Sequence, residues 1–480
     1  MLRLGVNFGK MMLPKSPVES NKREGTGMPE KVPSDSYRET SLARRVRIGR
    51  FLLVAQMVVR IYVGYKRIQL RGRFISQHGQ DERYARHHRR SAELIYRTAL
   101  RLEGWLVKAC QFIGTRADIL PKEYVEVLSR LHDQVPPRLF ALMKRRIEDE
   151  LGKPIAAVFS SLSTKPIAAA SLAQVHKATL HDGRHVAVKV QYPDIATLVD
   201  LDMRNVAFFV EWLARLEPRF DFRFVIKELR RYIPLELDFI HEAKNAEMVG
   251  KNFANRGNRD VLVPRIHWDY TTPRLLVMEF MDGIKVTDVD ALLKAGIDTR
   301  AVAQKLTDAY LQQILLDGLF HADPHPGNLL VQPGPRLVFL DFGLTKDLPP
   351  EFPAEMARLM TAIVMQDADA IVASFRRLGF VTKKGGAESL LVLGEAMLGH
   401  SVKENKSYAD PGMVERFNAE MAEAMRNDPI VEAPGDLVLV GRVMGLLSGV
   451  GKQLGSDVNL FVTLMPYLVA QNENPDSVTS

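Results

Sequence analysis

The sequence predicts an α/β chain of two lobes, a small lobe built on antiparallel strands and a larger, mostly helical lobe. Three patterns lead to this prediction. Ala173–Leu180 and His185–Gln191 form a strand pair around an Asp-Gly turn. A second pair of apolar strands flanks Pro333-Gly334-Pro335, and helical periodicity dominates from Glu351 to Tyr467. With 480 residues, 46% of them hydrophobic, the chain can bury such a core.

The segment from His321 to Phe339, closed by Asp341-Phe342-Gly343, carries the chemistry. Its first residues, His-Ala-Asp-Pro-His-Pro-Gly-Asn, set Asp323, Asn328 and Asp341 at kinase-like intervals. Phosphoryl transfer needs a positioned nucleophile and Mg²⁺ held by oxygen ligands. Asp323 is the candidate to orient or deprotonate the attacking group, and Asn328 and Asp341 are the candidate magnesium ligands. The pattern predicts a two-lobed protein-kinase-like fold that uses ATP and Mg²⁺.

A lysine in the second strand needs an anionic partner. Val190 and its neighbours at alternate positions face one way and Lys189 the other. Burying an unpaired ammonium group costs several kcal/mol, so ATP phosphates and a helix carboxylate should surround it. Glu242 is the candidate carboxylate, because Phe224–Phe253 has a helical pattern, interrupted near Pro234, directly after the hairpin region. Lys189 and Glu242 therefore join Asp323 as predicted catalytic residues.

These motifs resemble those of the UbiB/AarF family of atypical protein-kinase-like proteins. The resemblance runs from about Tyr84 to Tyr467. The matching motifs are Lys108-Ala109-Cys110-Gln111, Ala168-Ala169-Ala170-Ser171, Val186-Ala187-Val188-Lys189, Glu236-Leu237-Asp238, and those at His321 and Asp341. The resemblance implies an ATPase or unorthodox kinase that supports coenzyme Q or other isoprenoid-lipid pathways.

The resemblance also assigns nucleotide-binding roles. It implies that an alanine-rich loop replaces the usual glycine-rich one, and that a helical extension folds over the site, held by Glu236 and Asp238. Glu236 does not share a helical face with Asp238, so we expect it to point toward Lys108. The strand that ends at Glu279 becomes the hinge, whose backbone would bind adenine. The predicted cofactor-binding residues are Ala168, Ala169, Ala170, Ser171, Lys189, Glu279, Met281, Lys108 and Gln111.

Two features of the extension leave alternatives open. Without the resemblance, Lys108 and Gln111 are the polar side of an amphipathic helix predicted over Tyr84–Thr115. Cys110 stands where the family motif has glycine, and its thiol blocks a close backbone approach. Because it is the only cysteine, it forms no internal disulfide, and we expect a packed, inert side chain. The low cysteine content favours a reducing compartment.

A basic segment precedes the extension. No acid occurs between Glu39 and Asp81, whereas nine cations do, against a net charge of +8 for the chain: Arg44, Arg45, Arg47, Arg50, Arg60, Lys66, Arg67, Arg71 and Arg73. They flank an apolar run, Phe51–Val59, that is shorter than the roughly 20 residues needed to span a bilayer. The pattern predicts an amphipathic segment on an anionic membrane. The alternative is that its apolar stripe packs on the kinase-like body.

The chain is therefore divided into six parts. They are a disordered tail at 1–40, the basic amphipathic segment at 41–83, the helical extension at 84–160, the small lobe and hinge at 161–283, the large lobe at 284–470 and a tail at 471–480. The initial segment lacks a strong apolar core for a secretory signal. We predict a cytoplasmic protein, peripheral on the membrane, or one on the mitochondrial matrix side in a eukaryote.

Three functions fit the sequence. The first is a UbiB-like ATPase or atypical kinase at a membrane, with ATP, an anionic membrane surface and isoprenoid lipids or lipid-biosynthesis proteins as partners. The second is a small-molecule kinase resembling aminoglycoside and choline phosphotransferases, because His325 replaces the usual lysine. The third is a nucleotide-binding pseudokinase scaffold. Nucleic acid is disfavoured because no recognisable nucleic-acid module is present. The phosphoryl acceptor and a homodimer are left open.

Overall fold

The computed structural model describes most of the chain. The described residues are 41–71, 77–114, 121–128, 130–131, 137–217, 223–322, 325–395, 397, 420–421, 423–456, 458 and 460–473. The described residues from Arg47 onward belong to one compact unit. The predicted tail at 1–40 and residues 474–480 of the predicted C-terminal tail lie outside the described part.

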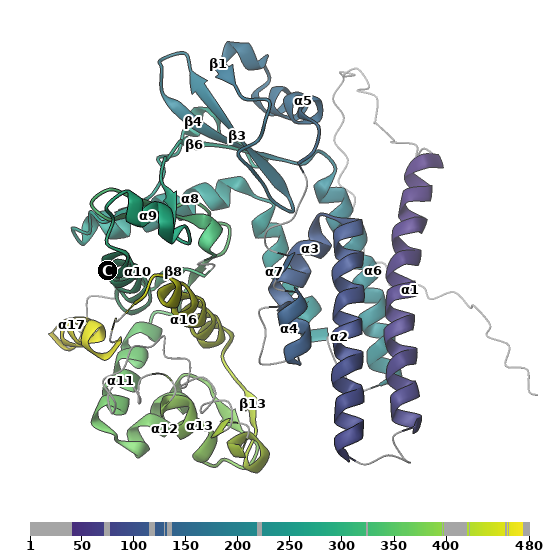
Figure 1. The fold of residues 1–480 in the computed structure, drawn as a ribbon, viewed down its shortest axis with the longest axis vertical. Helices are drawn as coiled ribbons and strands as arrows, with labels where there is room; N and C mark the ends of the chain where they lie inside the picture. The colour runs from purple at the N-terminus through teal and green to yellow at the C-terminus, as the bar shows by residue number, and fades with distance from the viewer. Residues whose placement is uncertain are drawn as a thin grey trace, which may run out of the picture. The chain divides into compact units, whose positions relative to one another are not determined.

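The small lobe is built on a five-stranded antiparallel sheet (Figure 1). Its strands are β1 (Phe159–Leu162), β2 (Ala168–Ala169), β3 (Ala173–Leu180), β4 (His185–Gln191) and β6 (Leu275–Glu279), in the order β1-β3-β4-β6 with β2 paired to β3. Strands β3 and β4 begin and end as predicted. Gly183 closes their turn with a φ of +90°, which glycine adopts without a side-chain clash.

Strand β4 separates two hydrophobic cores. Val188 packs in a core with Trp105, from a helix before the sheet, and Phe209, from the helix that follows β4. Ala187, on the opposite face of the strand, packs in a second core with Phe239. This arrangement confirms the predicted alternation, and it directs Lys189 to the same face as Ala187, toward the larger lobe.

Three helices follow the β3–β4 hairpin: α6 (Ile195–Leu216), α7 (Arg223–Glu236) and α8 (Phe239–Asn255). The interruption predicted near Pro234 occurs later, because Pro234 lies inside α7 and the chain breaks at Leu237 and Asp238. Asp238 has an extended backbone, and its carboxylate accepts a hydrogen bond from the Ile240 amide at 3.0 Å, which begins α8.

The large lobe is mostly helical. Its helices and helical turns are α9 (Val289–Lys294), α10 (Thr299–Gln312), a π-helical turn (Gln313–Asp317), a 3₁₀ turn (Pro326–Asn328), α11 (Phe352–Met365), α12 (Ala368–Arg377), α13 (Glu388–Gly394), α16 (Gly435–Gln453) and α17 (Leu460–Glu473). Its strands are β7 (Ile284–Lys285), β8 (Leu319–His321), β9 (Leu329–Gln332), β10 (Arg336–Phe339), β11 (Thr345–Asp347), β12 (Val381–Thr382) and β13 (Ile430–Glu432). A four-stranded sheet has the order β5-β10-β9-β7, with β5 at Val261–Leu262. The predicted hairpin around Pro333-Gly334-Pro335 is therefore present as β9 and β10.

The N-terminal helices are α1 (Ser41–Arg71), α2 (Gln77–Leu102), α3 (Trp105–Gly114), α4 (Lys122–Leu128) and α5 (Phe140–Leu151). The single helix predicted over Tyr84–Thr115 is wrong, because the chain breaks between α2 and α3. Glu103 and Gly104 have φ angles of +54° and +62°, in the left-handed region that ends a right-handed helix. A Cβ atom on Gly104 would lie 2.9 Å from Ile195 Cδ1, so glycine also fits the close contact with α6.

Helix α1 has one packed side and one exposed apolar side. The Phe51 ring lies 5.2 Å from that of Phe209 on α6, and Val54 is buried. Its exposed residues nevertheless include Leu52, Val59 and Leu70, which are 58%, 48% and 68% exposed. The sequence predicted a single apolar stripe on this helix, but the helix has two. One stripe packs on α6, as in the alternative of packing on the kinase-like body, and the second is exposed.

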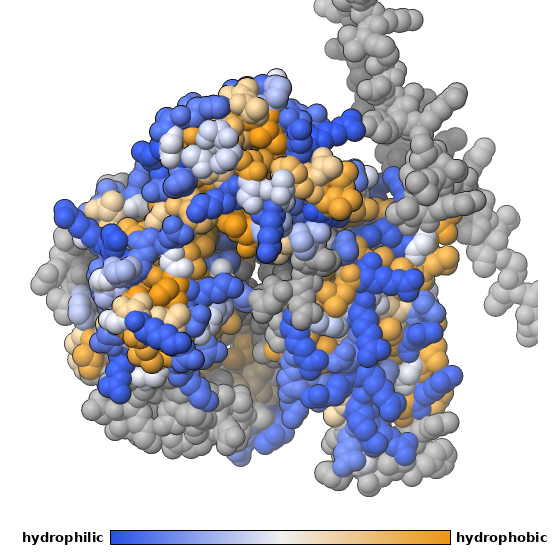
Figure 2. Space-filling model, turned by 45° about the horizontal axis from the view of Figure 1, so that its top comes forward, coloured by the Kyte–Doolittle hydropathy of each residue, from blue (hydrophilic) through white to orange (hydrophobic). Residues whose placement is uncertain are grey.

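The length of α1 changes the expectation that its apolar run is too short to span a bilayer. The 24 residues Arg47–Leu70 are long and apolar enough to cross a bilayer, by length and composition. Of their most apolar 18-residue stretch, 6% is buried. The apolar run Phe51–Val59 understated this length, because Ile61, Val63, Ile68 and Leu70 add further apolar residues to the same helix. Figure 2 shows orange hydrophobic side chains among blue charged ones along the right-hand edge of the molecule, the side on which α1 lies in Figure 1.

A buried ion pair attaches α1 to α6. Arg50 Nε donates to Asp202 Oδ1 at 2.9 Å, and Arg50 Nη1 donates to the carbonyl oxygen of Leu102 at 2.8 Å. The Asp202 side chain is completely buried and the Arg50 side chain is 12% exposed. Burial raises the pKa of Asp202, and Arg50 opposes this shift. Losing either partner would leave a buried charge without compensation.

We predict that Arg50→Leu lowers the free energy of unfolding by about 3 kcal/mol near neutral pH. A carboxyl group whose pKa is raised in the folded state destabilises the fold as the pH rises through that pKa. The deficit should therefore be larger at about pH 7.5 than at about pH 4.5. Urea unfolding at both pH values measures it. Arg60→Leu is the matched control, because Arg60 is exposed and has no ion pair among the described residues. Equal stability of the two variants would contradict the prediction.

Candidate active site

Lys189 lies between two carboxylates contributed by different elements. Its Nζ atom is 2.6 Å from Glu242 Oε1 on α8 and 3.4 Å from Asp341 Oδ2, which follows β10. The side chains of Lys189 and Glu242 are 12% and 5% exposed, whereas that of Asp341 is 39% exposed. Lys189 also lies 5.3 Å from the ring centroid of Phe239. The partner that the sequence suggested for Lys189 is thus in contact with it.

The charges of this cluster depend on one another. Burial lowers the pKa of Lys189, but Asp341 and Glu242 outweigh burial and raise it above its usual value. Burial raises the pKa of Glu242 to about 7 and Asp341 adds to this, while Lys189 opposes the shift. Burial also raises the pKa of Asp341, but Lys189 and Lys108 outweigh it, so that this pKa is well below its usual range. Lys189 therefore favours the charged form of both carboxylates, but it outweighs burial only at Asp341.

Hydrogen bonds from both lobes hold Asp341. Asp341 Oδ1 accepts from the Gly343 amide at 3.0 Å. The Asp341 carbonyl oxygen accepts from His321 Nε2, and the Tyr310 hydroxyl donates to His321 Nδ1 at 3.1 Å. On the small-lobe side, Asn245 Nδ2 donates to the Phe342 carbonyl oxygen at 3.2 Å. These bonds fix the backbone on both sides of the Asp341 carboxylate.

The sequence analysis did not identify the supporting residues Asn245, Tyr310 and Gln313. Gln313 Oε1 accepts from the His321 amide at 2.9 Å and comes from the π-helical turn. Asn245 could have been found, because it follows Glu242 by three residues and so shares its face of α8. Tyr310 and Gln313 gave no such signal, since nothing in their local pattern distinguishes them from helix-core positions.

Lys108 and Glu236 form an ion pair beside this cluster. Lys108 Nζ lies 2.9 Å from Glu236 Oε1. Glu236 therefore points toward Lys108, as we expected. A Cβ atom on Gly343 would lie 3.3 Å from Asp341 Oδ1 and 3.5 Å from Glu236 Oε2. The pair therefore lies directly against the Asp341-Phe342-Gly343 turn. Helix α3 brings Lys108 to the site, while Asp238 caps α8 and the Gln111 side chain lies outside the described residues.

Cys110 is packed in the core on the same helix. It is 7% exposed, and burial raises its pKa to about 12. A thiol with such a pKa carries almost no thiolate at neutral pH. The expectation of a packed, inert side chain at this position is confirmed.

The candidate metal ligands come from the turn after β8 and from the segment after β10. Asn328 ends the 3₁₀ turn, and its carbonyl oxygen accepts from the Leu340 amide at 3.0 Å, next to Asp341. His325 Nδ1 accepts from the Gly327 amide at 3.1 Å, which stabilises the turn. The predicted base Asp323 lies outside the described residues. No group of three or more His, Cys, Asp or Glu suited to a metal occurs in the described part of the chain.

This donor set suits magnesium bound together with nucleotide. Mg²⁺ is commonly held by one or two protein oxygen ligands, with phosphate oxygens and water completing its octahedron. Asp341 offers a partly exposed carboxylate and Asn328 an amide oxygen on a partly buried side chain. Metal-only binding would need more protein ligands, so Mg²⁺ fits here as a partner of ATP.

The two segments predicted to bind nucleotide have different structures. Ala168 and Ala169 form β2, the Ala170 amide donates to the Ala173 carbonyl at 2.8 Å, and Ser171 is buried. Tyr192 donates to the Ala170 carbonyl oxygen at 3.1 Å. The alanine-rich loop is therefore attached to the sheet at both ends.

In the hinge, the Glu279 carboxylate accepts from the Arg265 amide at 3.3 Å, and the Phe280 amide donates to His185. The backbone of Met281 makes no hydrogen bond to any other residue in the described part of the chain. Its amide and carbonyl groups can thus pair with an adenine edge.

The connection after Gly343 is short, since β11 pairs with β8 and α11 begins at Phe352. This connection leaves little room for an activation segment.

Comparison with known proteins gives the family. The ABC1 atypical kinase-like domain matches residues 130–375. AarF domain-containing protein kinase 1 of Gallus gallus is 35% identical, covering 70% of this chain and 64% of its own. The chloroplastic protein ACTIVITY OF BC1 COMPLEX KINASE 8 of Arabidopsis thaliana is 30% identical, covering 89% of this chain. This chain spans 59% of the length of that plant relative.

A solved structure supports the fold. Rv3197 of Mycobacterium tuberculosis, whose structure was solved with erythromycin, superposes with a TM-score of 0.59 and 24% identity over 80% of this chain and 97% of its own. The predicted two-lobed protein-kinase-like fold is thereby confirmed. With the ordered motifs, the Lys189 cluster and the domain match all in agreement, this chain belongs to the ABC1/AarF family of atypical kinase-like proteins.

Proposed function

We propose that this protein binds Mg-ATP and transfers its terminal phosphoryl group, to water or to an acceptor, as a UbiB-type ATPase or atypical kinase. The observation that carries the proposal is the contact of Lys189 with both Glu242 and Asp341. Kinase-like catalysis depends on such a lysine to hold phosphates and on a carboxylate to hold magnesium. Both groups are charged and positioned by the protein before ligand binds, so little reorganisation is needed.

Each residue has a distinct part in this proposal. Lys189 binds phosphate oxygens, and Glu242 orients Lys189 and balances its charge. Asp341 and Asn328 hold Mg²⁺, which neutralises charge on the phosphates when it is bound. Asp323 orients or deprotonates the attacking hydroxyl group or water. Met281 binds the adenine edge through its backbone, and the loop from Ala168 to Ser171 covers the phosphates.

The phosphoryl acceptor in this proposal is water or a small amphiphile and not a peptide. The short connection between Gly343 and α11 leaves out the platform on which peptide substrates of kinases dock. Helix α1 carries exposed Leu52 and Leu70, with cations on the same helix. We propose that this surface attaches the protein to an anionic membrane, where it supports ubiquinone or other isoprenoid-lipid metabolism.

Replacement of the metal ligand tests the nucleotide assignment. Asp341→Asn should abolish the stabilisation by Mg-ATP, because an amide is a weaker magnesium ligand and removes a negative charge from the site. Turnover should fall at least about a hundredfold. Thermal shift with Mg-ATP and phosphate release measure the two effects. Asp347→Asn, at an exposed position of β11, is the control. Unchanged stabilisation of Asp341→Asn by Mg-ATP would remove the assignment.

The contact between Lys189 and Glu242 predicts coupled effects. Lys189→Ala and Glu242→Gln should each lower kcat for ATP at least about a hundredfold, and the double variant should lose little more than Lys189→Ala alone. Steady-state ATP turnover of the four proteins completes the double-mutant cycle. Lys165→Ala, in the exposed connection between β1 and β2, controls for loss of a lysine in this lobe. Losses that multiply would show that the two residues act independently.

The exposed side of α1 predicts membrane affinity. The triple variant Leu52→Ser, Val59→Ser, Leu70→Ser should bind anionic vesicles at least about tenfold more weakly, because it removes exposed apolar surface from the interface. Co-sedimentation with vesicles measures the partition. The matched control places serine at three exposed apolar positions elsewhere, Leu139, Leu293 and Met365, which are 75%, 59% and 73% exposed. Equal binding by both triple variants would exclude α1 as the membrane contact.

A further inference from the structure

One face of α2 carries a row of arginines. Spacings of three and four residues place them on the same side of the helix, around Leu94. The members of this arginine row are Arg83, Arg86, Arg90, Arg97 and Arg101, and all five are exposed. The row extends over about five turns of helix. Such a row on a helix is usually solvated and neutralised by acids, so its pairing decides whether it can bind a ligand.

Most of the arginine row lacks a counter-charge. Arg86 lies 3.7 Å from Glu82, at an exposed position. In the part of the chain that the structure describes, Arg83, Arg90, Arg97 and Arg101 make no ion pair or hydrogen bond. The other basic groups nearby differ, since Arg89 lies 2.5 Å from Glu126 and Arg130 lies 3.1 Å from Glu93. The first pair joins α2 to α4 and the second joins α2 to the turn after α4, and both leave the arginine row uncompensated.

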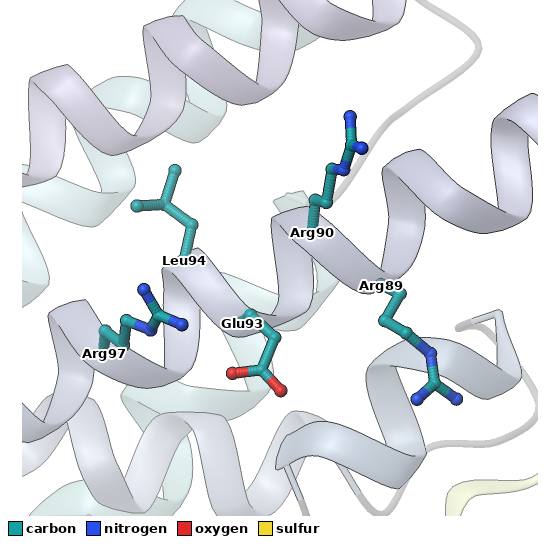
Figure 3. Close-up of a pocket in the computed structure, with 5 residues that line it drawn as sticks. All are labelled: Arg89, Arg90, Glu93, Leu94 and Arg97. Atoms are coloured by element: carbon teal, nitrogen blue, oxygen red, sulfur yellow. The ribbon is translucent and has the colours of Figure 1, made fainter.

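The centre of the arginine row borders a shallow pocket. The pocket has a volume of about 390 Å³ and is lined by Arg89, Arg90, Glu93, Leu94 and Arg97. Figure 3 shows Arg90 and Leu94 on one side of α2, and Arg89 and Glu93 directed to the other side. Glu93 is the one carboxylate at the pocket, and its pairing with Arg130 reduces its repulsion of an anion. The uncompensated charge at the pocket therefore belongs to Arg90 and Arg97.

Two guanidinium groups above a leucine suit a phosphate group with an apolar attachment. Arg90 and Arg97 are seven residues apart, about 10 Å along the helix, so their long side chains can converge above Leu94. A guanidinium group binds phosphate oxygens through two parallel hydrogen bonds. The small volume accommodates a headgroup but not a complete lipid. A phosphodiester, which carries one charge, can be shared between the two arginines.

The neighbouring helix favours a lipid as the source of the phosphate. His87 on α2 lies 3.1 Å from the carbonyl oxygen of Ile61 on α1, and the rings of Tyr65 and Tyr84 are 5.7 Å apart. Helices α1 and α2 therefore lie side by side (Figure 1). Since α1 presents exposed apolar side chains, a basic pocket on its neighbour combines the two chemistries of a phospholipid, a charged phosphate and hydrocarbon.

We propose that Arg90, Leu94 and Arg97 form a binding site for the phosphate headgroup of an anionic phospholipid. This inference rests on the proposed membrane attachment and assigns to α2 the recognition of the headgroup, whereas α1 supplies apolar contact. The site is separate from the Lys189 cluster, so its loss leaves ATP turnover without lipid unchanged.

The test uses the full chain and vesicles of phosphatidylcholine with or without phosphatidylglycerol. Arg90→Gln with Arg97→Gln should weaken binding to the anionic vesicles by roughly thirtyfold, as two surface cations contribute to binding on such lipid. Binding to neutral vesicles should stay unchanged. The matched control, Arg145→Gln with Arg259→Gln, removes the same charge from two exposed arginines elsewhere and should change binding less than about threefold. Melting temperatures confirm that all variants fold.

The outcomes separate this inference from the membrane proposal. If the unmodified protein binds no vesicles, both fail. If it binds anionic vesicles and the Arg90 and Arg97 variant binds them as well as the control, the headgroup site is wrong and the attachment by α1 survives. Competition with inorganic phosphate and glycerol phosphate forms a further arm. Displacement from vesicles by either anion, at a concentration where an equal ionic strength of chloride has no effect, would make soluble phosphate the ligand and overturn the lipid assignment.

Discussion

The structure of the site depends on one buried cation. Lys189 would be costly in the interior without partners, and Glu242 and Asp341 would each be costly without Lys189. The three charges come from β4, α8 and the segment after β10, so the small and large lobes meet through them. Because each charge compensates the others, the contact between the two lobes and the protonation states of these three side chains depend on each other.

Lys108 and Glu236 extend the same principle to the N-terminal helices. Their ion pair lies against Gly343, where a side chain would approach both Glu236 and Asp341. Helix α3 therefore contributes a positive charge to a region that already contains three carboxylates. The buried pair of Arg50 and Asp202 attaches α1 to α6, and Arg50 also donates to the carbonyl oxygen of Leu102 at the end of α2. Charges between elements, together with apolar packing around Trp105, thus position the N-terminal helices.

Much of the catalytic arrangement could be predicted from the sequence because it depends on local rules. An Asp-Gly turn between alternating apolar residues defines β3 and β4, and a lysine on a buried strand requires a carboxylate from the next helix. The break between α2 and α3 could not be predicted in this way. Glutamate is uncommon with positive φ, so the local preference of Glu103 does not predict its conformation. The two-sided apolar character of α1 likewise depends on which stripe meets α6, and periodicity alone does not determine this.

The break at Glu103 and Gly104 also fixes the rotation of α3 about its own axis. The two left-handed residues and the close contact of Gly104 with Ile195 define where α3 begins. Lys108 follows that start by a set number of residues, and each added or removed residue would turn it by about 100° around the helix. A single insertion between Trp105 and Lys108 would direct the ammonium group away from Glu236. Chain length in this short interval is therefore as strict a requirement as the identity of the lysine itself.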